Sequence, residues 1–430
     1  MSNVLPLTAV RYSSKTGSDI SSRLAPPYDV IDDEAKCGLL ERDASNFVRI
    51  DLPHMPPKDV GPPAAYEQAA ATLRGWLDDG TLVRDARPGF YAYHQSFRLA
   101  GRDFTRQMFF ARIRLEPFGS GSIFPHEQTF GGPKEDRLAL TKATACNMSP
   151  IFGLFEDRGN ELAALLSAGL ATEPLVEGDL NDTHNRLWAV TDDDPLASVR
   201  SLMKEKPIYI ADGHHRYGTA MMYRDWLVSR QGELPDQHPA NFVLFVLCAM
   251  EDAGLQILPT HRVLTAATDV TVDTFRADPQ LSVQELDASS ADQTPTALAA
   301  FGPQAVALRD PSGGGYFAIT PANAAVMTVI APDKSAAWRG LGVAFLHSYL
   351  IERVVTPKFF GGENPAISYV KSAAAAVELA SETGGACFLL QATTMAEMRS
   401  VCDAGDLMPQ KSTYFYPKLA SGLVINPLDA

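Results

Sequence analysis

Apolar and polar positions follow two different periods along this chain, and the alternation predicts both strands and helices. Phe90 to Leu99 and Phe104 to Leu115 are rich in apolar, aromatic and β-branched residues, and the segment between them predicts a β-hairpin turn. Ala64 to Leu77 places apolar side chains at helical spacing. Further strands are expected at 47–52, 149–155, 183–190, 242–250, 255–264, 305–308, 316–319 and 387–392, and further helices at 33–42, 135–144, 161–168, 295–301, 343–354 and 371–382. This mixture predicts the α/β (α+β mixed) class.

One stretch, residues 207–225, combines a buried strand, a turn and a helix. Ile208 to Ala211 is a short apolar run, Asp212-Gly213 ends it, and Tyr217 to Val228 has helical spacing. A helix that begins directly after a strand presents backbone N–H groups and the positive end of its dipole, which together attract anions. The stretch therefore predicts a phosphate-binding turn, at the strand end where ligands of open α/β sheets gather.

Five consecutive residues of this turn are candidates for the binding and catalytic groups. Gly213 would let the backbone approach a ligand closely, and Arg216 could fork onto phosphate oxygens. Asp212, His214 and His215 supply further ionisable groups. The alternative is that Asp212 caps the helix and that the two histidines and the arginine are merely solvated first-turn residues.

A second dense stretch of polar residues lies at 124–138 and is interrupted by Gly-Gly-Pro, which is typical of a loop. A solvated charged loop explains Lys134 and Glu135 well. It explains His126 and Glu127 less well, because they follow the apolar pair Ile123-Phe124. The candidate residues of this stretch are His126, Glu127, Thr129, Lys134, Asp136 and Arg137.

Two more segments are accessory candidates. Tyr28-Asp29 follows a rigid Pro-Pro pair and is either part of a site or a simple turn. The aromatic and apolar tail at 408–425 is expected to pack against the body of the protein. Lys411, Ser412, Thr413 and Lys418 would supply cations and hydroxyls if the tail lines a cleft, or would otherwise lie on an edge strand without a role in a site.

Composition limits the functional classes. The chain has 430 residues and a net charge of −14, which argues against a general nucleic-acid binder. Its five cysteines are scattered without CxxC spacing, as is typical of reduced thiols. We expect no signal peptide and no membrane span, and we predict a cytoplasmic protein. A homo-oligomer stays open. Three regions are expected, at 1–120, 121–235 and 236–430, the middle one being the core that holds both dense stretches.

Four segments, in this order, resemble the signatures of the family called domain of unknown function 1015. They are residues 24–31, 125–138, 210–220 and 408–428. The Asp-Gly-His-His-Arg segment is also similar to the phosphate-binding segment of free-serine kinases with a ParB/sulfiredoxin-like fold. The resemblance implies a ParB/sulfiredoxin-like core with N- and C-terminal α/β additions. It also implies that Gly213, His214, His215 and Arg216 form a phosphate cradle beside Asp212, with Glu127 as the base.

The leading hypothesis is a small-molecule phosphotransferase that moves a phosphoryl group from ATP or ADP to the hydroxyl of a small, serine-like metabolite. Phosphoryl transfer needs held phosphates, Mg²⁺ and cations to absorb charge, and a carboxylate to accept the hydroxyl proton. Lys134, Arg137 or Lys411 could supply cations, and Asp212 or Asp136 could hold Mg²⁺.

Two other classes stay open. A metal-dependent hydrolase could use Asp212, His214, His215 and His126 as ligands, with Glu127 activating a bound water. A non-catalytic nucleotide-binding protein, including a relative of the DNA-partitioning ParB proteins, would need only the phosphate-binding turn. The acidic composition weighs against DNA binding in this third class.

Overall fold

The computed structural model describes residues 3–56, 59–119, 121–127, 132–167, 170, 173–312 and 314–429. The chain divides into two compact units, which we call unit 1 and unit 2. Unit 1 comprises Met1–Pro125, Thr129–Gln256 and Pro417–Ala430, and unit 2 comprises His126–Gln128 and Ile257–Tyr416. The three regions expected from the sequence have other bounds, and they stay a prediction about how the chain is organised.

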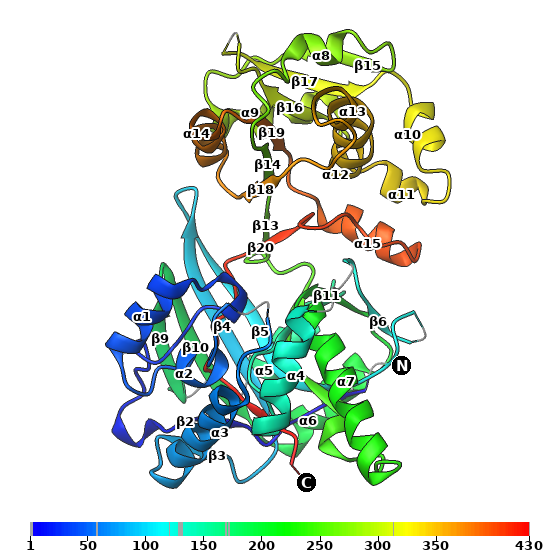
Figure 1. Ribbon diagram of the computed structural model, residues 1–430. Helices are drawn as coiled ribbons and strands as arrows, with labels where there is room; N and C mark the ends of the chain where they lie inside the picture. The colour runs from blue at the N-terminus through cyan, green and yellow to red at the C-terminus, as the bar shows by residue number, and fades with distance from the viewer. Residues whose placement is uncertain are drawn as a thin grey trace. The chain divides into compact units, whose positions relative to one another are not determined.

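Unit 1 is built on a mixed sheet that contains nine strands in the described part of the chain (Figure 1). The order is β6-β11-β8-β12-β5-β4-β10-β9, and β1 pairs with β5. The bounds are β1 Val4–Leu5, β4 Phe90–Leu99, β5 Arg102–Arg114, β6 Ile123–Phe124, β8 Ile151–Phe155, β9 Val176–Leu180, β10 Thr183–Val190, β11 Ile208–Asp212 and β12 Phe242–Ala249. β8 runs parallel to β12, and β6 runs parallel to β11, while the remaining pairs are antiparallel.

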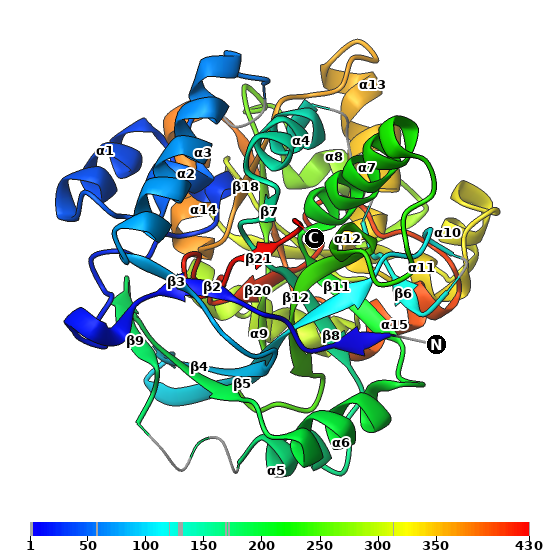
Figure 2. The same cartoon turned by 90° about the horizontal axis from the view of Figure 1, so that it is seen from below.

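Helices cover both faces of this sheet, with α5 and α6 on one side and α4 and α7 on the other (Figure 2). The core between them is apolar and includes Phe109, Phe245, Val199 and Tyr217 from four different elements. The bounds are α1 Asp33–Arg42, α2 Val48–Asp51, α3 Pro63–Asp78, α4 Gly132–Thr144, α5 Glu161–Ser167, α6 Asp193–Met203 and α7 His214–Gln231, with 3-10 helices η1 Ser14–Thr16, η2 Tyr28–Val30 and η4 Pro239–Asn241. Two short strand pairs complete the unit: β2 Val10–Tyr12 with β3 Leu82–Arg84, and β7 Cys146–Asn147 with β21 Asn426–Pro427.

Unit 2 contains an antiparallel sheet with the order β15-β17-β16-β19-β14-β18. Its strands are β14 His261–Leu264, β15 Leu281–Glu285, β16 Val306–Arg309, β17 Tyr316–Pro321, β18 Ile367–Val370 and β19 Ala386–Leu390, and β13 Gln256–Leu258 pairs separately with β20 Tyr414–Tyr416. The helices are α8 Val272–Arg276, η5 Ala291–Gln293, α9 Thr294–Leu298, η6 Ala299–Phe301, α10 Ala325–Ile330, α11 Ala336–Arg339, α12 Gly342–Phe345, α13 Thr356–Phe359, α14 Ala373–Thr383 and α15 Met395–Asp403, with a π-helix, η7 Leu346–Val355, between α12 and α13. Figure 1 shows α14 and the α12–α13 run on opposite sides of this sheet.

The mixed α/β class is confirmed, and so are most of the elements expected from periodicity. The segment 47–52 is an exception: it is predicted as a strand but contains helix α2. The Asn46 side chain accepts a hydrogen bond from the N–H of Val48 and donates to the carbonyl oxygens of Ser22 and Leu24. This side chain therefore fixes the turn that precedes α2, which the apolar pattern of the segment does not reveal.

None of the helices described combines the length and the apolar character that crossing a bilayer requires.

Candidate functional site

The phosphate-binding turn predicted from the sequence lies between β11 and α7 in unit 1. β11 is buried and pairs with β6 on one side and β8 on the other. Its register against β8 shifts between Ile210 and Asp212, and such a bulge re-aims the side chain at the end of the strand. α7 then begins at His214 and continues for 18 residues. The predicted strand, turn and helix are confirmed.

Gly213 is the residue that makes this turn possible. It is the N-cap of α7 and has φ +96°, in the region that side-chain-bearing residues avoid. A Cβ atom at this position would lie 2.9 Å from Nε of Arg216. The alternative in which Asp212 caps the helix is wrong, because Gly213 is the cap and no side chain caps this end.

Asp212 instead holds two cations beside the first turn of α7. Its Oδ2 atom lies 2.5 Å from Nζ of Lys418, and its Oδ1 atom lies 3.3 Å from Nη2 of Arg216. Arg216 also donates to the carbonyl oxygen of Pro150. Lys418 is 206 residues away in the sequence, in the C-terminal segment that returns to unit 1.

The electrostatics of this cluster favour a charged carboxylate. Burial alone would raise the pKa of Asp212, but Lys418 and then Arg216 hold that pKa well below its usual range. Two cations and one carboxylate leave a surplus of one positive charge. That surplus lies at the positive end of a helix dipole, where a further anion is stabilised.

The other candidates of the turn and of α4 lie close to this cluster. His214 is buried and its charged form would lower the pKa of Asp212 further. His215 is half-buried, and its carbonyl oxygen accepts a hydrogen bond from Thr219. Lys134 crosses α7 closely, since a Cβ at Gly218 would lie 2.9 Å from its Cδ atom. The structure therefore brings Lys134 to the helix that carries the turn.

Asp136 and Arg137 form a second, buried polar cluster in unit 1. Arg137 lies 2.6 Å from Oδ2 of Asp136 and 3.5 Å from Oδ1 of Asp51. Asp136 also accepts a hydrogen bond of 2.6 Å from Tyr66, and Asp51 accepts one of 2.8 Å from Ser149. Asp136 and Arg137 therefore have charged and hydrogen-bonding partners within the fold, which supports a structural role for both.

A small cavity of about 40 Å³ connects the two clusters, because Arg216, Arg137 and Asp51 all line it. Tyr28 lines it as well, with its ring 4.2 Å from the guanidinium carbon of Arg137, and burial raises the pKa of Tyr28 to about 12. Asp29, the next residue, is exposed. Sequence reasoning missed Asp51, which carries no local motif, and it identified Lys418 only as a further cation of the C-terminal tail, without its partner Asp212. Their roles depend on contacts across long stretches of chain.

The remaining candidates that the structure describes lie in unit 2. The backbone of His126 accepts from the N–H of Met408, and its Nε2 atom lies 2.9 Å from the hydroxyl of Thr413. Glu127 follows, with Oε1 3.7 Å from the imidazole of His126. Lys411 is exposed and Ser412 is buried in the same tail segment. Thr129 lies outside the described residues.

The candidate residues therefore fall into two groups, one in each unit. The structure supports the grouping within each unit. A single site that joins Glu127 to the β11–α7 turn stays a prediction.

Metal binding has little support from the side chains present. Among the residues described, no group of three or more His, Cys, Asp or Glu side chains could hold a metal ion. Asp212, the predicted Mg²⁺ ligand, is already paired with Lys418 and Arg216. A carboxylate between two cations does not fit a Mg²⁺ site, which needs oxygen ligands with negative charge to spare.

Comparisons with known proteins identify a family for the chain. The sequence profile described as "Protein of unknown function (DUF1015)" matches residues 4–339. None of the curated proteins matches significantly.

Several solved structures are similar at low identity. A free serine kinase variant in complex with AMP is 14% identical, covers 68% of this chain and 84% of its own, and has a TM-score of 0.34. A conserved hypothetical protein from Pyrococcus furiosus is 15% identical, covers 71% of this chain and 92% of its own, and has a TM-score of 0.33. C-terminally truncated SbnI from Staphylococcus aureus is 11% identical, covers 71% of this chain and 84% of its own, and has a TM-score of 0.33. Likenesses of this degree carry no argument about function, so function has to be argued from the residues themselves.

Proposed function

Since the chain belongs to the DUF1015 family of proteins of unknown function, we propose from its own geometry that it is a small-molecule phosphotransferase. It binds the phosphates of ATP or ADP at the turn between β11 and α7. The observation that carries this proposal is the cluster of Asp212, Arg216 and Lys418 at the beginning of α7.

Binding follows from the charge and the donors of this cluster. Arg and Lys are the side chains that recognise phosphate most often, one as a planar fork and the other as a point charge. Asp212 fixes both cations in place, and Gly213, which has no Cβ, lets the guanidinium of Arg216 lie against the backbone of the turn. An incoming phosphate would be stabilised by the surplus positive charge and by the dipole of α7.

Transfer requires a second, hydroxyl-bearing substrate. The hydroxyl oxygen attacks the terminal phosphorus, the bond from that phosphorus to the bridging oxygen of the nucleotide breaks, and the hydroxyl proton passes to a carboxylate. Glu127 is the proposed base, and the acceptor is a small hydroxylated metabolite of serine-like size. We assign no step to Mg²⁺, because the partners of Asp212 do not fit it.

One observation favours a second candidate, nucleotide binding without transfer. Every group of the phosphate cluster belongs to unit 1, whereas Glu127 belongs to unit 2. Binding and transfer can therefore be tested separately.

Calorimetric titration of the full chain with ATP and with ADP tests binding. Lys418→Met should weaken the affinity about tenfold or more, because it removes a charged donor from the phosphate. Lys204→Met, a change of the same kind at an exposed position of unit 1, is the matched control and should bind as the parent does. Equal affinity in all three proteins would refute the phosphate site.

Nucleotide consumption in the presence of serine, threonine, glycerate or a small polyol tests transfer. Glu127→Gln should keep nucleotide binding and lose turnover, while Asp212→Asn should weaken both. Nucleotide binding without consumption with any acceptor would favour the second candidate.

A further inference from the structure

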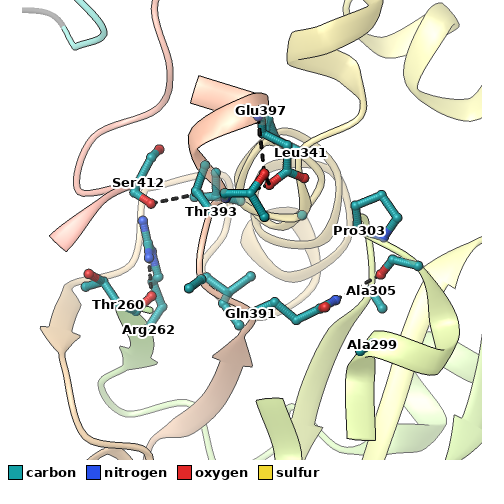
Figure 3. Close-up of a pocket in the computed structure, with 16 residues that line it drawn as sticks. Thr260, Arg262, Ala299, Pro303, Ala305, Leu341, Gln391, Thr393, Glu397 and Ser412 are labelled. Carbon is teal, nitrogen blue, oxygen red and sulfur yellow. Dashed lines mark hydrogen bonds between the residues drawn. The ribbon is translucent and has the colours of Figure 1, made fainter. Parts of the chain in front are cut away.

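Unit 2 contains a cavity of about 260 Å³, and Ser412 is the member of the predicted accessory residues that lines it (Figure 3). It lies where β14 and β19 meet the beginnings of α12 and α15. Polar side chains on its wall include Thr260, Arg262, Gln391 and Glu397, and apolar side chains such as Leu341 and Val343 complete it. A volume below the usual range for drug-sized ligands suits a small metabolite.

Arg262 is the most unusual residue of this wall. It is only 1% exposed, yet no carboxylate of the described chain lies within ion-pair distance of it. Its Nε donates to His347, its Nη1 to the carbonyl oxygen of Thr260, and its Nη2 to the carbonyl oxygens of Gln410 and Lys411. A guanidinium has five N–H donors, so one on Nη1 is left over.

Burying a cation without a nearby carboxylate costs free energy, and the pKa of Arg262 reflects this cost. Burial lowers the pKa of Arg262 to about 10, although Tyr369 and Glu127 oppose the shift through space. An anionic group in the adjoining cavity would supply the missing counter-charge and the missing hydrogen-bond acceptor.

Other elements present acceptors to the same cavity. Glu397 uses Oε2 to cap α15 through the backbone and hydroxyl of Thr394, and its Oε1 has no hydrogen bond in the part of the chain described. Gln391 donates from Nε2 to Gly302, which leaves its Oε1 as an acceptor. Figure 3 shows Arg262, Gln391 and Glu397 reaching the cavity from different segments of unit 2.

The two charges define the ligand. The guanidinium of Arg262 favours an anionic group on the ligand, and the carboxylate of Glu397 favours a cationic one. A phosphate dianion would be repelled by the carboxylate of Glu397. A carboxylate and an ammonium group on one small molecule satisfy both charges, and the neutral acceptor of Gln391 accommodates a further N–H or O–H.

We propose that this cavity binds a small zwitterionic metabolite of the free amino acid class, its carboxylate toward Arg262 and its ammonium toward Glu397. The site lies entirely within unit 2 and goes beyond the proposed phosphate chemistry of unit 1.

Ligand-observed NMR followed by calorimetry tests the site on the full chain, with the common free L-amino acids as probes. For the amino acid that binds best, its hydroxy-acid and amine analogues are titrated beside it, because each lacks one of the two charges. Both analogues should bind about tenfold more weakly than the amino acid. No binding of any amino acid would overturn the proposal.

Variants identify the groups. Glu397→Gln removes the charge but preserves the capping geometry of α15. It should weaken the affinity for the amino acid about tenfold and leave the affinity for the hydroxy-acid analogue unchanged. Arg262→Lys should weaken the affinity for both ligands. Glu382→Gln, on the exposed face of α14, is the matched control for Glu397→Gln and should leave both affinities unchanged. Unchanged amino acid affinity in both Glu397→Gln and Arg262→Lys would overturn the assignment.

One further variant separates this site from the proposed function. Lys418→Met should weaken nucleotide binding and leave amino acid binding unchanged. Loss of amino acid binding in Lys418→Met would contradict a site confined to unit 2.

Discussion

Two buried arginines, one in each unit, are compensated in opposite ways. Arg137 in unit 1 pairs with two carboxylates, Asp51 and Asp136, so its positive charge is more than compensated. Arg262 in unit 2 is surrounded by carbonyl oxygens and a neutral imidazole. The first arrangement is self-sufficient and stabilises the fold. The second lacks a carboxylate partner and an acceptor for one N–H of Nη1, and an anionic ligand would supply both.

The turn between β11 and α7 stands between these extremes. Asp212 balances one of its two cations and leaves the other charge available to a ligand. The three clusters therefore differ in whether carboxylates of the chain compensate the cations, and each of the following changes tests that difference.

The largest effect is expected from Arg137→Met. It leaves Asp51 and Asp136 buried without a cation, and breaking a buried pair in this way costs about 3–5 kcal/mol. The free energy of unfolding in urea measures the loss. A cost below about 1 kcal/mol would show that the two carboxylates are neutral or solvated, contrary to the pairing seen here.

The second largest loss of stability is expected from acidification, through the imidazole of His347. Burial and the neighbouring Arg262 lower its pKa to about 4 from the ordinary 6.5, so it accepts the Arg262 hydrogen bond as a neutral ring. The unfolded chain binds this proton between pH 6.5 and 4 and the folded chain does not, so stability is lost as pH falls through that window. The loss is roughly 3 kcal/mol for a shift of this size.

His347→Gln supplies the control for acidification, because its amide oxygen can still accept from Arg262. The free energy of unfolding should then fall less steeply with decreasing pH, while stability at pH 7 changes little. An unaltered slope in this variant would contradict a neutral His347.

Arg262→Met should lower the free energy of unfolding by about 2 kcal/mol, less than Arg137→Met. The reason is that it leaves neutral acceptors, and not carboxylates, without a donor. Urea unfolding of the two variants under the same conditions makes the comparison. If Arg262→Met proved as costly as Arg137→Met, the distinction between the two arginines would be lost.

The smallest effect is expected from Gly213→Ala, about 1 kcal/mol, because alanine is strained at φ +96°. The added Cβ would also displace Arg216 from Asp212 and weaken nucleotide binding. Thermal unfolding and calorimetry measure the two effects. Gly232→Ala, at the other end of α7, also introduces strain at a positive φ but meets nothing within 4 Å of its Cβ, so it is the control for nucleotide affinity and should bind as the parent does.

The sequence by itself determined the elements whose signals are local. The hairpin of β4 and β5, helix α3, and the strand, turn and helix around Gly213 follow from periodicity and turn residues within a short window. The family also follows from sequence, because four separated segments resemble its signatures and its profile matches most of the chain.

Only the tertiary structure decided which charges are paired. Lys418 reaches Asp212 across 206 residues, and Arg137 reaches the Asp51 side chain across 86. Arg262 looks like an ordinary strand residue until its burial and partners are known. The periodicity of a segment indicates which face of its helix or strand is apolar. A buried charge, in contrast, is compensated by whichever group the fold brings near it, and that group can come from any part of the chain.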